Sequence, residues 1–240
     1  MTLSKLSPIS CYDHEVDVGR FSALTFEISF ETAQFKKHLL KLYRDTYLIP
    51  LPSTVAGISC AILGVEKSLL KDFVREKELY SGAMLLNYDG LMSETMTVVK
   101  MKNWREIIRT PKRNVILFRP SYKFAIASSD HDLIQKLLER IETLNFEFDL
   151  FGGNDYNFVS DIGRARKAEL KVADSGYGYC KLGDLIGFEG DGVIQIDEVN
   201  EGYIRKYAFG YRLKLRVNRG LAVFDGDNSV FVHNAWKFLR

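Results

Sequence analysis

Residues 46–64 read TYLIPLPSTVAGISCAILG, and this stretch fixes the local fold more firmly than any other part of the chain. Its two prolines, Pro50 and Pro52, exclude a central strand or a helix interior at that point. Ser53 is placed to cap a helix start. Apolar residues then follow at helical spacing up to Gly64, which is a natural helix end, and they are Val55, Ile58, Ala61 and Ile62. The stretch therefore predicts a turn and then a helix.

Gly57 interrupts this predicted helix. A glycine inside a helix costs about 1 kcal/mol relative to alanine. Such a residue usually permits the close approach of another backbone. We expect that neighbour to be either the sheet of the same chain or a ligand.

Outward toward the N-terminus, residues 21–30 alternate between apolar and polar side chains. Leu24, Phe26, Ile28 and Phe30 share one face, with Thr25, Glu27 and Ser29 opposite. The pattern predicts a half-buried strand. Residues 1–20 have little periodicity and form either an extension or an edge strand. Residues 31–47 are polar and basic, with no clear strand pattern.

Outward toward the C-terminus, the pattern predicts further helices and strands. A second helical piece covers residues 69–79, and a longer helix with a 3.6-residue period begins after Ser129 or Asp130. Strands are expected at residues 80–88, 95–101, 114–118, 122–127 and near 157–162. The order of strand, helix, strands, helix and strand is typical of a ferredoxin-like or RRM-like sandwich.

The last third of the chain is nearly all β by pattern. A glycine-rich region spans residues 175–192, and residues 211–217 alternate between apolar and basic side chains. We therefore predict an α+β protein with two domains: an RRM-like domain over residues 1–175, and a small, mostly β domain over residues 176–240.

Composition excludes several classes of protein. The chain has 240 residues, 46% of them hydrophobic and 27% charged, which is ordinary for a globular protein. Its three cysteines are far apart, so neither a disulfide framework nor a zinc site is indicated. No stretch approaches the roughly 20 apolar residues of a membrane span, and the N-terminus lacks the order of a secretory signal. We expect a cytoplasmic protein without a cofactor or a bound metal.

The formal net charge of +2 hides an uneven distribution of charge. Four basic residues and no acid lie within residues 36–44, and six basic residues against Glu106 alone lie within residues 100–113. Residues 205–219 hold six more without an acid, whereas acids dominate from Asp184 to Glu201. Local charge sets the field that a polyanion feels. Each basic run is either a solvated surface or part of a nucleic-acid site.

The stretch from Thr46 to Gly64 resembles the signature of the fifth CRISPR-associated protein family, the RAMP-type subunits of type I surveillance complexes (Cascade). In that family a first strand leads into a Tyr-x-x-Pro-x-Pro-Ser-x-x-x-Gly segment and a helix ending in glycine. The glycine turn Phe151-Gly152-Gly153-Asn154 also resembles the family pattern. The resemblance covers roughly residues 22–170, and the C-terminal part matches only in being rich in β-structure.

The resemblance implies a role in binding RNA. Such proteins cap the guide RNA by gripping its 5′ tag, and they contact a large subunit and the first backbone RAMP subunit of Cascade. Target DNA is reached only through the complex, and no membrane is involved. A β-hairpin thumb inserted in the RRM-like domain folds over the RNA, and here it corresponds to about residues 92–119.

The candidate RNA-binding residues combine cations with stacking and turn positions, because RNA is held by phosphate contacts and by bases stacked on aromatic or guanidinium planes. They are Lys36, Lys37, His38, Lys41, Arg44, Tyr47, Ser53, Lys100, Lys102, Trp104, Arg105, Arg109, Lys112, Arg113, Gly152 and Gly153. For several of them a structural role is an open alternative. Trp104 is either a core residue or a stacking platform, Tyr47 either packs beneath the proline turn or stacks a base, and Gly152-Gly153 either approaches RNA or makes a turn.

The main alternative is a metal-independent endoribonuclease that cleaves repeat RNA, since some members of the family have this activity. They resemble RNases that use a tyrosine with a Lys-His pair from the middle of the chain. Here the central basic region has no histidine, and Lys37-His38, near Tyr43 and Tyr47, is the candidate that remains.

A third possibility is an interaction module whose basic runs contact an acidic protein. Asp184, Glu189 and Asp191 either bind a divalent ion or are solvated loop acids. Phosphate-loop, zinc-protease and nucleophile-elbow motifs are missing.

Overall fold

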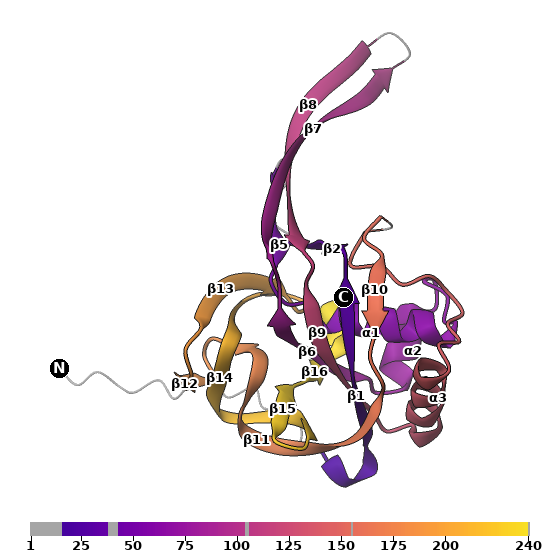
Figure 1. Cartoon of the computed structure of the whole chain (residues 1–240), viewed down its shortest axis with the longest axis vertical. Helices are drawn as coiled ribbons and strands as arrows, with labels where there is room; N and C mark the ends of the chain where they lie inside the picture. Colours follow the sequence, from indigo (N-terminus) through magenta and orange to yellow (C-terminus); the bar gives the residue numbers. More distant parts are fainter. Residues whose placement is uncertain (1–15, 38–42, 104–105, 155, 240) are drawn as a thin grey trace, which may run out of the picture.

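The computed structural model describes residues 16–37, 43–103, 106–154 and 156–239. Figure 1 shows a body with a large sheet, helices on one side of it and a long hairpin that projects from it. The helices are α1 (Pro52–Leu63), α2 (Leu70–Glu76) and α3 (His131–Glu142), with short 3-10 segments η1 (Val18–Arg20) and η2 (Ala235–Leu239). The first seven strands are β1 (Ser22–Phe30), β2 (Thr32–Ala33), β3 (Phe35–Lys36), β4 (Tyr43–Arg44), β5 (Thr46–Tyr47), β6 (Tyr80–Asn87) and β7 (Gly90–Asn103). The remaining strands are β8 (Glu106–Phe118), β9 (Ser121–Ser128), β10 (Val159–Ile162), β11 (Arg166–Lys181), β12 (Leu185–Glu189), β13 (Val193–Asn200), β14 (Ile204–Asp225), β15 (Asn228–Phe231) and β16 (His233–Asn234).

Helix α1 forms where the decisive stretch predicts it. Gly64 ends it in the left-handed conformation, with φ of 81°. Two details of the prediction are wrong. Pro52 is the first helical residue and Leu51 the N-cap, so Ser53 lies one position inside the helix and makes no capping hydrogen bond. Gly57 has open space where a Cβ would sit, so the sheet does not approach it closely, and the ligand alternative stays a prediction.

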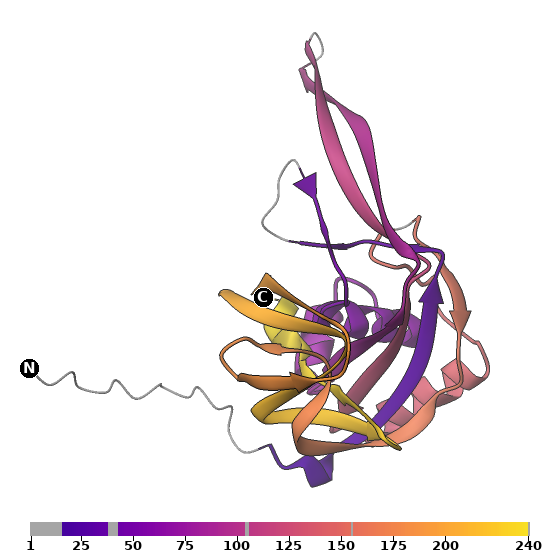
Figure 2. The same ribbon diagram turned by 60° about the vertical axis from the view of Figure 1, so that its left-hand side comes forward.

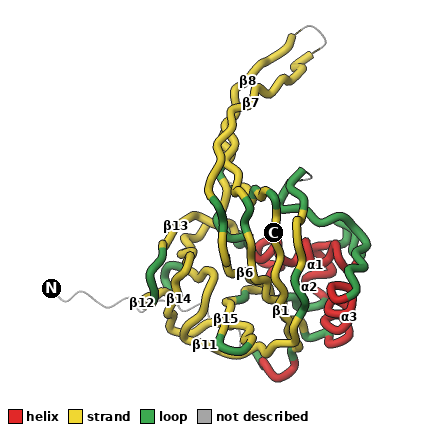
Figure 3. Tube along the Cα trace, in the orientation of Figure 1, coloured by secondary structure: helices red, strands yellow, loops and turns green. Residues whose placement is uncertain are grey.

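The central strands run in the order β10, β1, β9 and β6, with α1 and α3 on one face (Figure 3). Leu24, Phe26 and Ile28 of β1 point into the main core cluster, which also holds the apolar residues of both helices. Helix α3 begins as predicted, because the Asp130 side chain accepts a hydrogen bond from the Leu133 N–H.

The opposite face of β1 is not the solvated face that the alternation predicted. Thr25 is buried and donates to Asp225 of β14 at 3.0 Å. Ala23 joins a second cluster with Leu170, Val223 and Val230. The C-terminal strands therefore curl back over the sheet and bury it on both sides (Figure 2).

The C-terminal strands continue the same sheet. Strand β11 pairs antiparallel with β1 through residues 166–168 and with β14 through residues 169–181. The domain boundary predicted at residue 175 falls inside this strand, and the division into two domains stays a prediction.

Candidate nucleic-acid interface

The projecting hairpin consists of β7 and β8, and these two strands are called the arm below. They pair antiparallel from Gly90↔Phe118 to Asn103↔Glu106. Directly opposite side chains share a face of such a ribbon. Arg109, opposite Val99, and Arg113, opposite Thr95, are therefore on one face, and Lys112, opposite Met96, is on the other. The arm thus carries cations on both faces.

Short strands from the preceding basic segment hold the base of the arm. Strand β2 pairs with β8 at Leu117 and Phe118, and β4 runs parallel to β8 at Arg113 and Asn114. The register places Arg44 opposite Asn114, on the same face as Lys112. Two basic runs that are more than 50 residues apart in the sequence therefore meet at the base of the arm.

Three described cations of this surface lie without a neighbouring acid. Within the described residues, Arg44, Arg109 and Lys112 form no ion pair. Arg113 donates from Nε to the Ser93 hydroxyl at 2.6 Å. An uncompensated cluster of Lys and Arg attracts the phosphates of a nucleic acid.

Lys37 is a correction to the predicted set. Its Nζ lies 2.8 Å from Asp45 and 2.8 Å from Asp197, and it is largely buried. Burial lowers the pKa of Lys37, but the hydrogen bonds to Asp197 and Asp45 outweigh burial and raise it overall. The side chain ties the basic segment to β13, and its charge is already balanced within the protein.

Tyr47 is a second correction, because its ring is buried and stacked on Phe209 with 5.6 Å between centroids. Its hydroxyl donates to the Glu198 carbonyl at 2.7 Å. Neither face of the ring can receive a base without breaking this packing. Ser53, in the first turn of α1, lies between buried Pro52 and Val55 and is only partly exposed.

Gly152 and Gly153 approach their own chain, not an open surface. A Cβ on Gly152 would lie 2.9 Å from the Ala33 Cβ and 3.0 Å from the Thr32 carbonyl oxygen. A Cβ on Gly153, whose φ is 97°, would overlap the Gln34 carbonyl oxygen. The missing side chains let the glycine turn pack against β2, where the Gln34 N–H donates to the Gly152 carbonyl.

The rest of the predicted set is described only in part. Lys36 is exposed on β3. For Lys100 and Lys102 the backbone positions on β7 are described, but not the side chains. His38, Lys41, Trp104 and Arg105 lie outside the described residues, so the predictions for them stay open.

A buried polar network at the base of the arm has no signal in the sequence. Gln34 Nε2 donates to the Val115 carbonyl at 3.0 Å, and Asn154 Nδ2 donates to Gln34 Oε1 at 2.8 Å. Asn114 Nδ2 donates to Glu94 at 3.0 Å, while its Oδ1 is buried without a hydrogen-bond partner. Because buried amides cost free energy when unpaired, this network favours one position of the arm relative to the glycine turn.

The described histidines lie away from the arm. His131, in the first turn of α3, is hydrogen-bonded to Ser22 of β1. His233 of β16 is enclosed by the rings of Tyr179, Tyr207 and Phe238.

Among the described residues, no group of His, Cys, Asp and Glu side chains could hold a metal ion. None of the described helices is long and apolar enough to cross a membrane.

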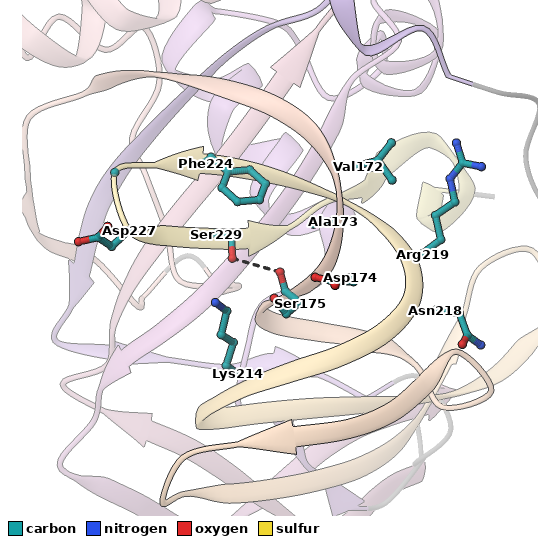
Figure 4. Close-up of a pocket in the computed structure, with 11 residues that line it drawn as sticks. Val172, Ala173, Asp174, Ser175, Lys214, Asn218, Arg219, Phe224, Asp227 and Ser229 are labelled. Carbon is teal, nitrogen blue, oxygen red and sulfur yellow. Dashed lines mark hydrogen bonds between the residues drawn. The ribbon is translucent and has the colours of Figure 1, made fainter.

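A separate hollow of about 720 Å³ lies between β11, β14 and β15 (Figure 4). Lys214 and Arg219 face it together with Asp174 and Asp227. The Ser229 hydroxyl donates to the Ser175 carbonyl at 3.2 Å across this hollow. The mixed charges give it no field of a single sign, unlike the arm.

Comparisons with known proteins show what this chain is similar to. Residues 23–76 match the family described as CRISPR-associated protein (Cas_Cas5). A crystal structure of a CRISPR protein from Archaeoglobus fulgidus is similar over 88% of this chain and 98% of that one, with a TM-score of 0.54 and 11% identity. A chain of a structure titled "CRISPR RNA-guided surveillance complex" is similar over 82% of this chain and 91% of that one, with a TM-score of 0.46 and 15% identity. No curated protein sequence matches the chain.

The fold and the surface together define a mixed α and β protein with one large sheet and a projecting cationic arm. The matched segment, residues 23–76, contains the stretch from Thr46 to Gly64 that suggested the family. Residues 23–76 are therefore similar to the CRISPR-associated Cas5 family, and the fold of the chain is similar to that of the CRISPR protein from Archaeoglobus fulgidus.

Proposed function

We propose that the chain is a non-catalytic subunit of a type I CRISPR surveillance complex. In this role it binds and caps the 5′ tag of the guide RNA and joins the large subunit to the backbone subunits in the cytoplasm. The observation that carries the proposal is the arm. Its described cations Arg109 and Lys112, with Arg44 at its base, have no acidic partner within the described part of the chain.

We also infer that β1, α1, β6, β9, α3 and β10 form a ferredoxin-like unit. Their strand order supports this assignment, because β1 lies between β10 and β9 and both helices lie on one face. The arm is then the thumb of that unit, inserted between β6 and β9. It starts at Gly90 and ends at Phe118, close to the span predicted from the sequence.

The physical argument is electrostatic. Each phosphate neutralised by Lys or Arg releases counterions. The logarithm of the affinity for a single strand therefore falls by about 0.7 per phosphate contact for each tenfold rise in salt concentration. Cations on both faces of a narrow ribbon allow phosphates to pass on either side of it. The buried network around Gln34 supports the base of the ribbon, so that less ordering is needed on binding.

The test compares two triple variants that remove equal charge. The first changes Arg109, Lys112 and Arg113 to alanine. The control changes Lys67, Lys71 and Lys136, which are exposed on the helical side. With a short RNA carrying the 5′ tag, we expect the arm variant to lower the salt slope by about 2 and the control to leave it nearly unchanged. Equal slopes for both variants would refute RNA binding by the arm.

The proposal includes no cleavage of RNA. It is supported by the positions of His131 and His233, away from the arm, and by the burial of Tyr47. Incubation of the purified chain with labelled repeat RNA and EDTA tests it directly. Intact RNA agrees with the proposal, whereas a discrete product that is lost in His38→Ala would establish the endoribonuclease.

A further inference from the structure

One edge of the large sheet is formed by β12 and β13 lying end to end. Both strands pair antiparallel with β14. They pair with one edge of β14, whereas β11 pairs with its other edge. Ala208, for example, pairs with Ile196 of β13 and with Cys180 of β11. Leu215 likewise pairs with Phe188 of β12 and with Gly176 of β11. Among the described strands, none pairs with the outer side of β12 or β13. Figure 2 shows these strands at the flank of the body.

This edge presents bulky apolar side chains to solvent. Ile186, Phe188, Val193 and Ile196 are each more than half exposed. The register places Phe188 opposite Leu215 and Ile196 opposite Ala208, and both partners belong to the third buried cluster. Phe188 and Ile196 therefore continue an apolar core past the last strand. Native sheet edges are usually protected by lysine, proline or a covering segment. Residues 185–200 contain neither lysine nor proline, and among the described residues Lys37 and Tyr47 contact only the Asp197–Glu198 end of this edge.

The same edge is acidic. Between Asp184 and Ile204 the chain has six acids and no Lys or Arg. Lys37 pairs with Asp197, and both Lys181 and Arg205 pair with Glu201 on the inner side. Within the described residues, Asp184, Asp191 and Glu198 form no ion pair. Such a surface repels the RNA that the arm attracts, and it also disfavours pairing with the same edge of a second copy.

We propose that the β12–β13 edge is a docking site for an extended polypeptide segment of another protein, one that alternates basic and apolar side chains. The segment adds a strand to the sheet through main-chain hydrogen bonds. Its apolar side chains cover Phe188 and Ile196, and its Lys or Arg side chains lie near Asp184 and Asp191. The inference goes beyond RNA binding by the arm and does not depend on it.

The test measures binding of synthetic eight-residue peptides to the full chain by fluorescence anisotropy. The probe alternates Lys and Val. One control replaces Lys by Glu, and a second carries N-methyl groups on alternate amides, which block strand pairing. We expect the Lys-Val peptide to bind at least tenfold more tightly than either control. Equal binding of the Lys and Glu peptides would overturn the charge argument, and equal binding of the N-methylated peptide would overturn strand addition.

Variants then locate the site. Phe188→Lys combined with Ile196→Lys should weaken binding of the Lys-Val peptide at least tenfold. Leu144→Lys, at an equally exposed apolar position after α3, should leave it unchanged. Binding that is unaffected by the double variant would overturn the proposal. So would a dimer in sedimentation that the double variant abolishes, because the edge would then serve a second copy of the chain. Both variants should keep the RNA salt slope, which separates this inference from the function of the arm.

Discussion

Gly153 shows how a single residue sets the position of the arm. Its φ of 97° is unfavourable for residues with a side chain, and a Cβ would overlap the Gln34 carbonyl oxygen. We therefore expect Gly153→Ala to lower the free energy of unfolding by about 2 kcal/mol or more. Denaturant unfolding followed by circular dichroism measures the change.

Gly57→Ala is the matched control and should have the opposite sign. Gly57 lies inside α1 with nothing within 4 Å of the position of a Cβ. Alanine should therefore stabilise the helix by about 0.5–1 kcal/mol. Loss of stability in both variants would contradict the packing described for Gly57, and no loss in Gly153→Ala would contradict the fit of the glycine turn.

His233 makes the stability of the protein sensitive to acid. Burial among aromatic rings lowers the pKa of His233 to about 4; the hydrogen bond with the Tyr179 carbonyl and the charge of Glu201 raise this pKa by less, and the charges of Lys181 and Lys237 lower it further. In the unfolded chain its pKa is about 6.5. The unfolded state therefore binds more protons between these values, and stability falls as the pH drops from about 6.5 to about 4, by up to about 3 kcal/mol.

Unfolding of His233→Gln over this pH range tests the assignment. Glutamine does not titrate, so the pH slope should flatten even if the variant is less stable overall. An unchanged slope in His233→Gln would show that another group causes the acid sensitivity.

Among the elements, those with a strong local signal could be predicted from the sequence. Helix α1 ends at Gly64, and α3 starts at the Asp130 cap, because spacing and capping act within a few residues. Strands β2 to β5 have two residues each and exist through pairing with β8 or with each other. No local pattern encodes such pairing. The sequence left Tyr47 open between packing and base stacking for the same reason, since Phe209 and Glu198, which contact it, follow about 150 residues later.

The arm is predicted to be dispensable for the stability of the body. Among the described residues, 97–103 and 106–111 pair only with one another across β7 and β8. Replacing residues 97–111 by Asn-Gly joins Met96 to Lys112 through a two-residue turn that suits a hairpin, and keeps the pairing of β2 and β4 with β8. We expect the unfolding free energy to change by less than about 1 kcal/mol.

The same excision should greatly weaken RNA binding, which a filter-binding titration with the 5′-tag RNA measures. The control is the full-length chain with Thr97→Ser and Thr110→Ser. These changes alter the arm but remove no charge from it. Retained affinity after excision would assign RNA binding to the body. Collapse of stability would show that the outer arm packs on the body.

On the scale of the molecule, a net charge of +2 conceals two opposite surfaces. Cations gather on the arm and its base, while the β12–β13 edge is acidic and apolar. The acidic run was visible in the sequence, but its position on an unpaired sheet edge was not, because that depends on the register of β14 with four other strands. Separate fields allow one chain to attract RNA at one place and a basic polypeptide at another.

The shared core predicts that the chain unfolds as one unit. The main cluster joins Leu24, Phe26 and Tyr47 to Tyr179, Phe209 and Phe238, which lie beyond the boundary predicted at residue 175. A fragment of residues 1–175 would expose the apolar side chains that these partners cover, at about 25 cal/mol per Å² of apolar surface. We expect the full chain to show a single calorimetric transition, and the fragment to lack a cooperative one. Two resolved transitions in the full chain, the first matching the melting of an isolated fragment, would instead establish two independent domains.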